Sequence, residues 1–177
     1  MAKFVVPDIT GEAIMDIAKI LASSPEPLSK SSLYDSFPTD VSQAYVNRAI
    51  TATCRLGLAA ESSSGLEIAQ KYRDNIKRLS RSELYIALAQ ALTDYPPFML
   101  YADLINKGYV STEAAKITRG VLNVATGTQI VERSLRLWGL YSKTLEFNEK
   151  ERSVQISFKV DRLAPELVKK LEEAVRD

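Results

Sequence analysis

The sequence predicts a mainly α-helical protein with two small β-hairpins and a C-terminal helix. Three observations lead to this fold class. Apolar residues recur at helical spacing along most of the 177-residue chain. Two pairs of short apolar stretches each flank a polar turn, as in a hairpin. Each pair follows an apolar helix that runs into a Gly-Leu pair, at 57–58 and at 139–140.

The first half of the chain should form three helices and a hairpin. The expected helices cover 10–22, 29–36 and 41–56, and the expected strands cover 58–61 and 66–69. Thr10 is a suitable N-cap for the first helix, with Asp8 as the alternative, and the prolines within 23–27 end it. Gly57 ends the third helix, where a left-handed backbone is usual.

The second half should repeat this order. The expected helices cover 82–93, 98–106, 112–124, 128–138 and 165–175, and the expected strands cover 141–147 and 153–159. Alternation predicts that Leu145 and Phe147 share one buried strand face.

A comparison of the two halves predicts a duplicated unit with one insertion. The apolar pattern around Pro25 recurs around Pro96, and the Gly-Leu pair at 57–58 recurs at 139–140. The two Gly-Leu pairs are further apart in the sequence than the two prolines, and this difference predicts an extra helix at 111–121. In this alignment Trp138 is a core residue at the position of Leu56, and each Gly-Leu pair is the exit from a third helix.

The order of helix, short helix, turn, longer helix and hairpin over 10–69, with Leu-Gly-Leu at 56–58, resembles the winged helix-turn-helix superfamily. Ser134, Arg136 and Trp138 form an S-x-R-x-W pattern that resembles winged-helix modules of bacterial DNA-defence and DNA-processing systems. The resemblance implies a tandem winged helix-turn-helix fold. Its parts would be a first unit over 1–69, a basic linker helix over 70–81, a second unit over 82–160 and a C-terminal helix over 161–177.

Composition limits the classes of function. The chain has no histidine, which removes imidazole bases, Ser-His and Cys-His pairs and most zinc sites. It also lacks the Gly-Lys-Ser/Thr pattern of a phosphate-binding loop. We therefore expect no enzymatic activity, no cofactor and no metal. A single cysteine, Cys54, and the lack of a signal-peptide or membrane-spanning run predict a cytoplasmic protein without a membrane segment.

The charge distribution favours contact with a polyanion in the middle of the chain. Net charge is −3 over 1–69, +5 over 70–145 and −1 over 146–177. Winged-helix units usually place the third helix in the DNA major groove. Candidate contacts to double-stranded DNA are Gln43, Asn47, Arg48, Gln129, Arg133 and Arg136 on the third helices, and Lys71, Arg73, Lys77, Arg78 and Arg81 in the linker.

Other interpretations stay open. The polar helix faces can simply be solvated, and the linker can pack through Tyr72, Ile76 and Leu79. The hairpin turns do not favour phosphate binding, because 61–65 has no basic residue and 148–152 mixes signs. The leading hypothesis is a DNA-binding regulator of transcription, or a DNA-contacting subunit of a larger complex. The alternative is a protein-interaction adaptor that docks onto a partner, or homodimerises, through its winged-helix surfaces and the C-terminal helix with Leu167, Leu171 and Val175.

Overall fold

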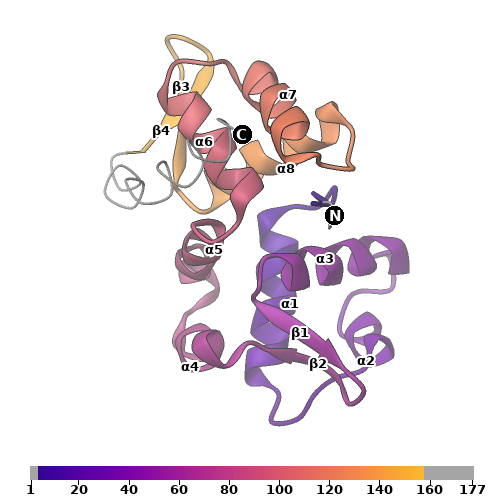
Figure 1. The fold of residues 1–177 in the computed structure, drawn as a ribbon. Coiled ribbons are helices and arrows are strands. Elements are labelled where there is room, and N and C mark those ends of the chain that lie inside the picture. Colours follow the sequence, from indigo (N-terminus) through magenta and orange to yellow (C-terminus); the bar gives the residue numbers. More distant parts are fainter. Residues whose placement is uncertain (1–3, 158–177) are drawn as a thin grey trace. The chain divides into compact units, whose positions relative to one another are not determined.

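The computed structural model describes residues 4–157, which form a mainly helical protein with two small antiparallel hairpins, as the sequence predicts (Figure 1). Ile9–Ala91 forms one compact unit, here called the N-unit. Met1–Asp8 and Leu92–Asp177 together form the other, the C-unit. The predicted C-terminal helix and its Leu167, Leu171 and Val175 lie outside the described residues.

The N-unit contains three helices, a hairpin and a fourth helix. These elements are α1 (Gly11–Ser23), α2 (Lys30–Asp35), α3 (Gln43–Arg55), β1 (Ala59–Ser62), β2 (Gly65–Ile68) and α4 (Gln70–Arg78). The N-unit also includes the residues that follow α4 up to Ala91. The predicted cap of α1 is confirmed, because the amide of Ala13 donates to Thr10 Oγ1 at 3.2 Å. Gly57 follows α3 with a φ of +75°, as its sequence context predicts.

The hairpin of the N-unit is extended by the chain that precedes α2. β1 pairs with β2 so that Ala59 lies opposite Ile68. Leu28 and Leu66 exchange two backbone hydrogen bonds, of 2.8 and 2.7 Å. Gly65 is required here, because its φ is +124° and a Cβ would lie 2.7 Å from the carbonyl oxygen of Leu28.

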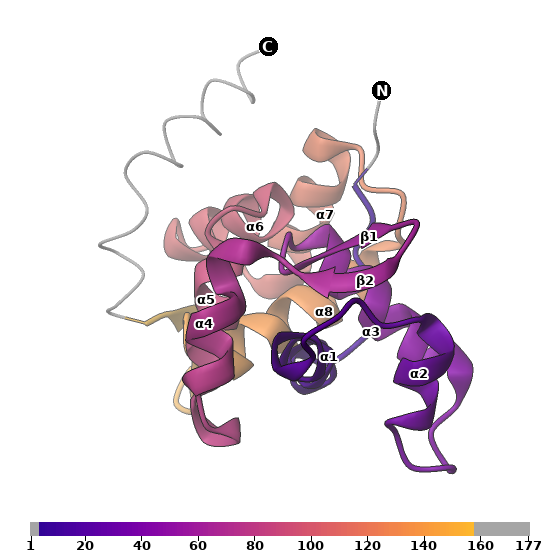
Figure 2. The ribbon, with the colours of Figure 1, turned by 90° about the horizontal axis from the view of Figure 1, so that it is seen from below.

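The segment predicted as a linker is part of the N-unit. α1 lies between α3 and α4, as the two views in Figures 1 and 2 show. α4 buries Tyr72 and Ile76, which was one of the two interpretations open at the sequence level. Lys19 of α1 donates from Nζ to the carbonyl oxygens of Ile76, Lys77 and Leu79, at 3.0, 2.8 and 2.7 Å. These bonds bring a charged donor to the C-terminal end of α4, where the last carbonyls of a helix lack the usual intrahelical donors. The carbonyl of Ile76 also accepts from the amide of Leu79 at 3.2 Å.

A short 3-10 helix, η1 (Arg81–Glu83), and α5 (Tyr85–Leu92) stand where the sequence predicts one helix over 82–93. The C-unit then contains α6 (Pro96–Asn106), α7 (Ser111–Leu122), α8 (Thr128–Tyr141), β3 (Leu145–Asn148) and β4 (Ser153–Ile156). α7 packs against both α6 and α8. Trp138 of α8 is fully buried, with its ring centroid 6.2 Å from that of Tyr95.

The start of the chain completes the C-unit. The amide of Ala125 donates to the carbonyl of Phe4 at 2.9 Å, and the amide of Val6 donates to Thr126 Oγ1 at 3.0 Å. Tyr95 and Ser134 donate from their hydroxyls to the carbonyls of Val5 and Pro7, at 2.9 and 2.8 Å. The segment 4–8 is therefore held from several points along residues 95–134.

The second Gly-Leu pair is not a helix exit, so that prediction is wrong. α8 continues through Gly139 to Tyr141, and the left-handed residue that follows it is Lys143, with a φ of 60°. Gly139 serves close packing instead. A Cβ at this position would lie 2.3 Å from Cδ1 of Leu145, so any larger residue would force this buried side chain to shift.

The repeated order of elements has a different register from the predicted one. α6 follows α1, α8 follows α3 and β3 follows β1 at a nearly constant separation in the sequence, as their first residues show: Gly11 and Pro96, Gln43 and Thr128, and Ala59 and Leu145. The buried residues of α3 and α8 match in the same register: Val46, Ala49, Ile50 and Thr53 correspond to Val131, Ser134, Leu135 and Trp138. Trp138 thus takes the place of Thr53, not Leu56. In chain order α7 corresponds to α2, so the helix at 111–121 is not an insertion.

Within residues 4–157, none of the helices combines the length and the apolar character needed to cross a lipid bilayer.

Candidate nucleic-acid interface and a neighbouring pocket

The predicted DNA contacts on α3 lie on an exposed face of that helix. Ser42 caps α3 by accepting from the amide of Tyr45 at 3.1 Å. Gln43 is exposed in the first turn. Asn47, Thr51 and Arg55 follow Gln43 at spacings of four positions, and Arg48 lies three positions before Thr51. This spacing places the residues on one face, and all are exposed.

This α3 face carries positive charge without nearby acidic residues in the sequence. No Asp or Glu occurs over 41–58. Arg48 and Arg55 form no ion pair within residues 4–157. The hydroxyl of Tyr34 donates to Asn47 Oδ1 at 2.5 Å, which orients the amide and leaves its NH2 group to donate. Arg55 was missed in the sequence, although it lies two helical turns after Arg48 and so on the same face.

Most of the basic residues on α4 also make contacts within the N-unit. The ammonium of Lys71 lies 5.0 Å from the ring centroid of Tyr72. Arg73 donates to the carbonyl of Ser24 at 3.1 Å, and Arg78 donates to the carbonyl of Asp74 at 3.3 Å.

Arg81 and Lys77 complete the basic segment. Arg81 lies 3.9 Å from the carboxylate of Asp16, whose pKa is raised by burial despite this neighbour. Lys77 is exposed and forms no ion pair with any residue in the described part of the chain. The basic segment therefore supports the N-unit fold as well as offering charge to a partner.

The arginines predicted as DNA contacts on α8 are engaged inside the C-unit. Arg133 makes two bonds to the Asp8 carboxylate, at 3.2 and 2.5 Å, and the hydrogen bonds to Asp8 raise its pKa. Arg136 donates from Nε to Glu132 Oε1 at 2.7 Å. Gln129 is exposed on the first turn. The sequence predicts DNA contacts on both α3 and α8. The arginines of α8 bind carboxylates, whereas those of α3 form no ion pair within the described residues.

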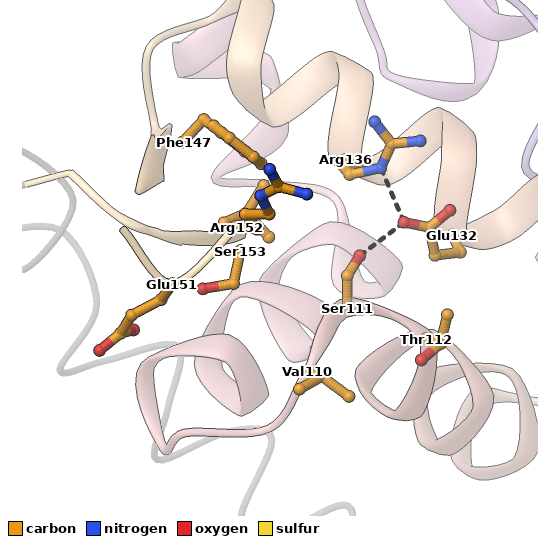
Figure 3. Close-up of a pocket in the computed structure, with 10 residues that line it drawn as sticks. Val110, Ser111, Thr112, Glu132, Arg136, Phe147, Glu151, Arg152 and Ser153 are labelled. Carbon is orange, nitrogen blue, oxygen red and sulfur yellow. Dashed lines mark hydrogen bonds and ion pairs between the residues drawn. The ribbon is translucent and has the colours of Figure 1, made fainter. Parts of the chain in front are cut away.

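A pocket of about 400 Å³ lies in the C-unit where the start of α7, the middle of α8 and the β3–β4 hairpin meet (Figure 3). The residues of its lining that matter here are Val110, Ser111, Glu132, Arg136, Phe147 and Arg152. Phe147 was predicted to share the buried strand face of Leu145. Leu145 is buried, but Phe147 is 54% exposed at the pocket.

A chain of hydrogen bonds holds one wall of this pocket. Ser111 Oγ lies 2.5 Å from the hydroxyl of Tyr101 and donates to Glu132 Oε1 at 2.7 Å. The same carboxylate oxygen accepts from Arg136. Tyr101 is fully buried, and burial raises its pKa to about 12, so the hydroxyl stays protonated at neutral pH. The orientation of Arg136 is thus fixed by a chain of hydrogen bonds that begins at the buried hydroxyl of Tyr101.

Residues 4–157 contain no group of three or more Cys, Asp or Glu side chains that could hold a metal ion. Comparisons of the chain with protein-family models, with curated proteins and with solved structures found no match in any of the three.

Proposed function

We propose that the chain is a non-enzymatic protein of two winged helix-turn-helix units that binds double-stranded DNA. It would act as a regulator or as the DNA-contacting subunit of a larger complex. The support for the units is their shared order of three helices and a hairpin. This order recurs at a nearly constant separation in the sequence, with matching buried positions on α3 and α8.

The observation that carries the proposal is the exposed face of α3. It has no acidic residue along the helix, and its two arginines form no ion pairs with the described residues. A third helix of this kind can enter the major groove. There Arg48 suits the acceptor edge of guanine, and the amides of Gln43 and Asn47 suit adenine. Arg55 lies two turns further on and suits a backbone phosphate.

The two units would then contribute unequally. α8 corresponds to α3 in chain order, but its Arg133 binds Asp8 and its Arg136 binds Glu132. A DNA phosphate would have to compete with these carboxylates. We therefore assign the main DNA contact to the N-unit, with Lys77 of α4 as a supporting cation.

A specific observation favours the adaptor alternative for the C-unit. Tyr109, Val110 and Phe147 are three large apolar side chains exposed by 46%, 56% and 54%. Val110 and Phe147 line the same pocket. Exposed apolar groups gathered in this way are more typical of a binding surface for a protein or small molecule than of a phosphate contact.

The test is fluorescence anisotropy of a labelled random-sequence duplex, titrated with the protein at low and physiological salt. We expect binding that weakens steeply with salt, because phosphate contacts release counterions. Replacing both Arg48 and Arg55 by alanine should weaken binding at least about tenfold, since a good arginine contact contributes roughly 1–3 kcal/mol.

The matched control is Lys116→Ala, which removes an exposed cation from α7 and should leave the affinity unchanged. Equal losses in the control and in the double variant would show general charge attraction and would contradict a role for α3. No binding at low salt would contradict the DNA proposal and favour the adaptor.

A further inference from the structure

The pocket of the C-unit has the size of a small-molecule site. Its volume of about 400 Å³ lies within the range of roughly 300–1,000 Å³ that is usual for such sites. Its lining comes from α7, α8, the hairpin and the residue before α7, all within one unit. The described lining therefore lies within the C-unit alone.

The charges in the pocket favour a ligand with one negative charge. The charge of Glu132 is offset by Arg136, which uses Nε for that pair and is one-third exposed. Arg152 forms no ion pair with any residue from 4 to 157. Figure 3 shows its guanidinium turned toward the side of Arg136, whereas the carboxylate of Glu151 points away. Glu151 also belongs to the lining, so the formal charges of its two arginines and two glutamates balance. Because the Glu151 carboxylate points away from the arginines, the guanidinium of Arg152 can still meet an anionic group at the mouth of the pocket.

The other walls are apolar and unusually exposed. Phe147 of β3 and Val110 before α7 line the pocket with more than half of each side chain open to water. Most large apolar side chains in the described part of the C-unit are buried, and Val110 and Phe147 are more exposed than Tyr109 and Val121, which are also exposed there. An apolar group placed between them would remove their surfaces from water.

The polar wall is already ordered before any ligand arrives. Arg136 is held by Glu132, Glu132 by Ser111, and Ser111 by the buried hydroxyl of Tyr101. A side chain fixed in this way loses little conformational entropy when it binds. On the opposite side Arg152 has a left-handed backbone, with a φ of 50°, at the end of the hairpin turn.

We propose that this pocket binds a small organic carboxylate. Its anionic group would lie on Arg152 and on the free amino groups of Arg136, and its apolar body would lie between Phe147 and Val110. The guanidinium groups supply planar donors that match a carboxylate. This inference is independent of DNA binding through α3, which lies in the other unit.

The test is a titration of the isotope-labelled full chain, followed by amide chemical shifts in NMR. The probes are phenylacetate and 4-methylpentanoate, with the uncharged phenylacetamide as the matched ligand. We expect the carboxylates to shift amides around 110–112, 132–136 and 147–154. We also expect phenylacetamide to bind at least about fivefold more weakly than phenylacetate, because it lacks the charge.

Two variants locate the site on the protein. Arg152→Ala and Phe147→Ala should each weaken phenylacetate binding at least about fivefold, since each removes one of the two kinds of contact. Lys150→Ala is the control, because it removes an exposed cation from the same turn but does not line the pocket. Amide signals that keep the chemical-shift dispersion of the parent protein would verify that each variant is folded.

Several outcomes would overturn the proposal. One is that neither carboxylate shifts these amides at concentrations up to about 10 mM, the weak end for a ligand of this size. Another is an equal loss of affinity in Lys150→Ala and Arg152→Ala, which would indicate general charge attraction. A third is displacement of phenylacetate by duplex DNA from the same residues, which would assign the pocket to the DNA backbone.

Discussion

Two glycines inside helices of the C-unit have opposite surroundings. Gly139 of α8 faces Leu145 of β3, and a Cβ added there would lie 2.3 Å from Cδ1 and 2.6 Å from Cγ of that buried side chain. Gly120 of α7 is exposed, and a Cβ there would meet no atom within 4 Å. The same substitution therefore tests packing at one site and helix propensity at the other.

We expect Gly139→Ala to lower the free energy of unfolding by about 1–3 kcal/mol, because the extra methyl overpacks the contact between α8 and β3. Gly120→Ala, the matched control, should raise it by about 0.5–1 kcal/mol, because alanine loses less backbone entropy in a helix. Urea denaturation of both variants measures the two changes. A Gly139→Ala protein as stable as the parent would show that Leu145 can move aside.

The limits of sequence-based prediction are clear at single residues. Arg48 and Arg133 stand at corresponding places in α3 and α8, and the sequence predicts the same role for both. The structure separates them because Asp8, which is far from Arg133 in the sequence, binds its guanidinium. Such a pairing leaves no local pattern. The pocket was missed for the same reason, since Val110, Arg136 and Phe147 are distant in the sequence.

At the scale of elements, one side chain of α1, that of Lys19, binds the C-terminal end of α4. Lys19 places three donors on the carbonyls at the end of α4, and α4 packs against α1 through Tyr72 and Ile76. We expect Lys19→Met, which keeps most of the side-chain length, to lower the free energy of unfolding of the N-unit by about 1.5–3 kcal/mol. The physical reason is that carbonyls in a half-buried site lose a charged donor.

Lys116→Met is the control for this substitution, because Lys116 is an exposed residue of α7. It should change stability by less than about 0.5 kcal/mol. Urea denaturation, combined with amide hydrogen exchange along α4, measures both variants. If Lys19→Met behaves like the control, the three hydrogen bonds contribute nothing net to the N-unit.

The cap of α1, the end of α3 and both hairpins were predicted correctly, but the alignment of the first half of the chain with the second half was not. The Thr10 cap, the Gly57 exit and both hairpins follow from residues within a few positions of one another. The register of the repeat does not, because apolar spacing recurs at every helical turn and so allows several alignments. The predicted alignment placed residues 82–93 against α1, whereas the observed spacing places α6 there.

At the scale of the whole molecule, the N-unit is a continuous stretch of chain, and the C-unit is assembled from two separate stretches. Removal of residues 1–8 deletes the partners of Tyr95, Ala125, Thr126, Arg133 and Ser134. We expect this shortened chain to show faster amide exchange in the C-unit, while peptides from α1 to α4 exchange as before.

Hydrogen–deuterium exchange followed by mass spectrometry distinguishes the two units in this experiment. A chain that lacks only residues 1–3 is the matched control, since the hydrogen bonds made by residues 4–8 remain possible. Unchanged protection of α8 after loss of residues 1–8 would show that the segment is dispensable for the C-unit.

Because the C-unit consists of two separate stretches of chain, its two parts are translated at different times. Residues 4–8 are translated before Arg133 and Ser134, which bind Asp8 and Pro7 and follow about 125 positions later in the sequence. At roughly 5–20 residues per second, the segment waits on the order of 6–25 seconds for these partners. The N-unit is continuous, so its whole sequence is translated during that interval. Residues 4–8 thus reach these native contacts only after the whole N-unit has been translated.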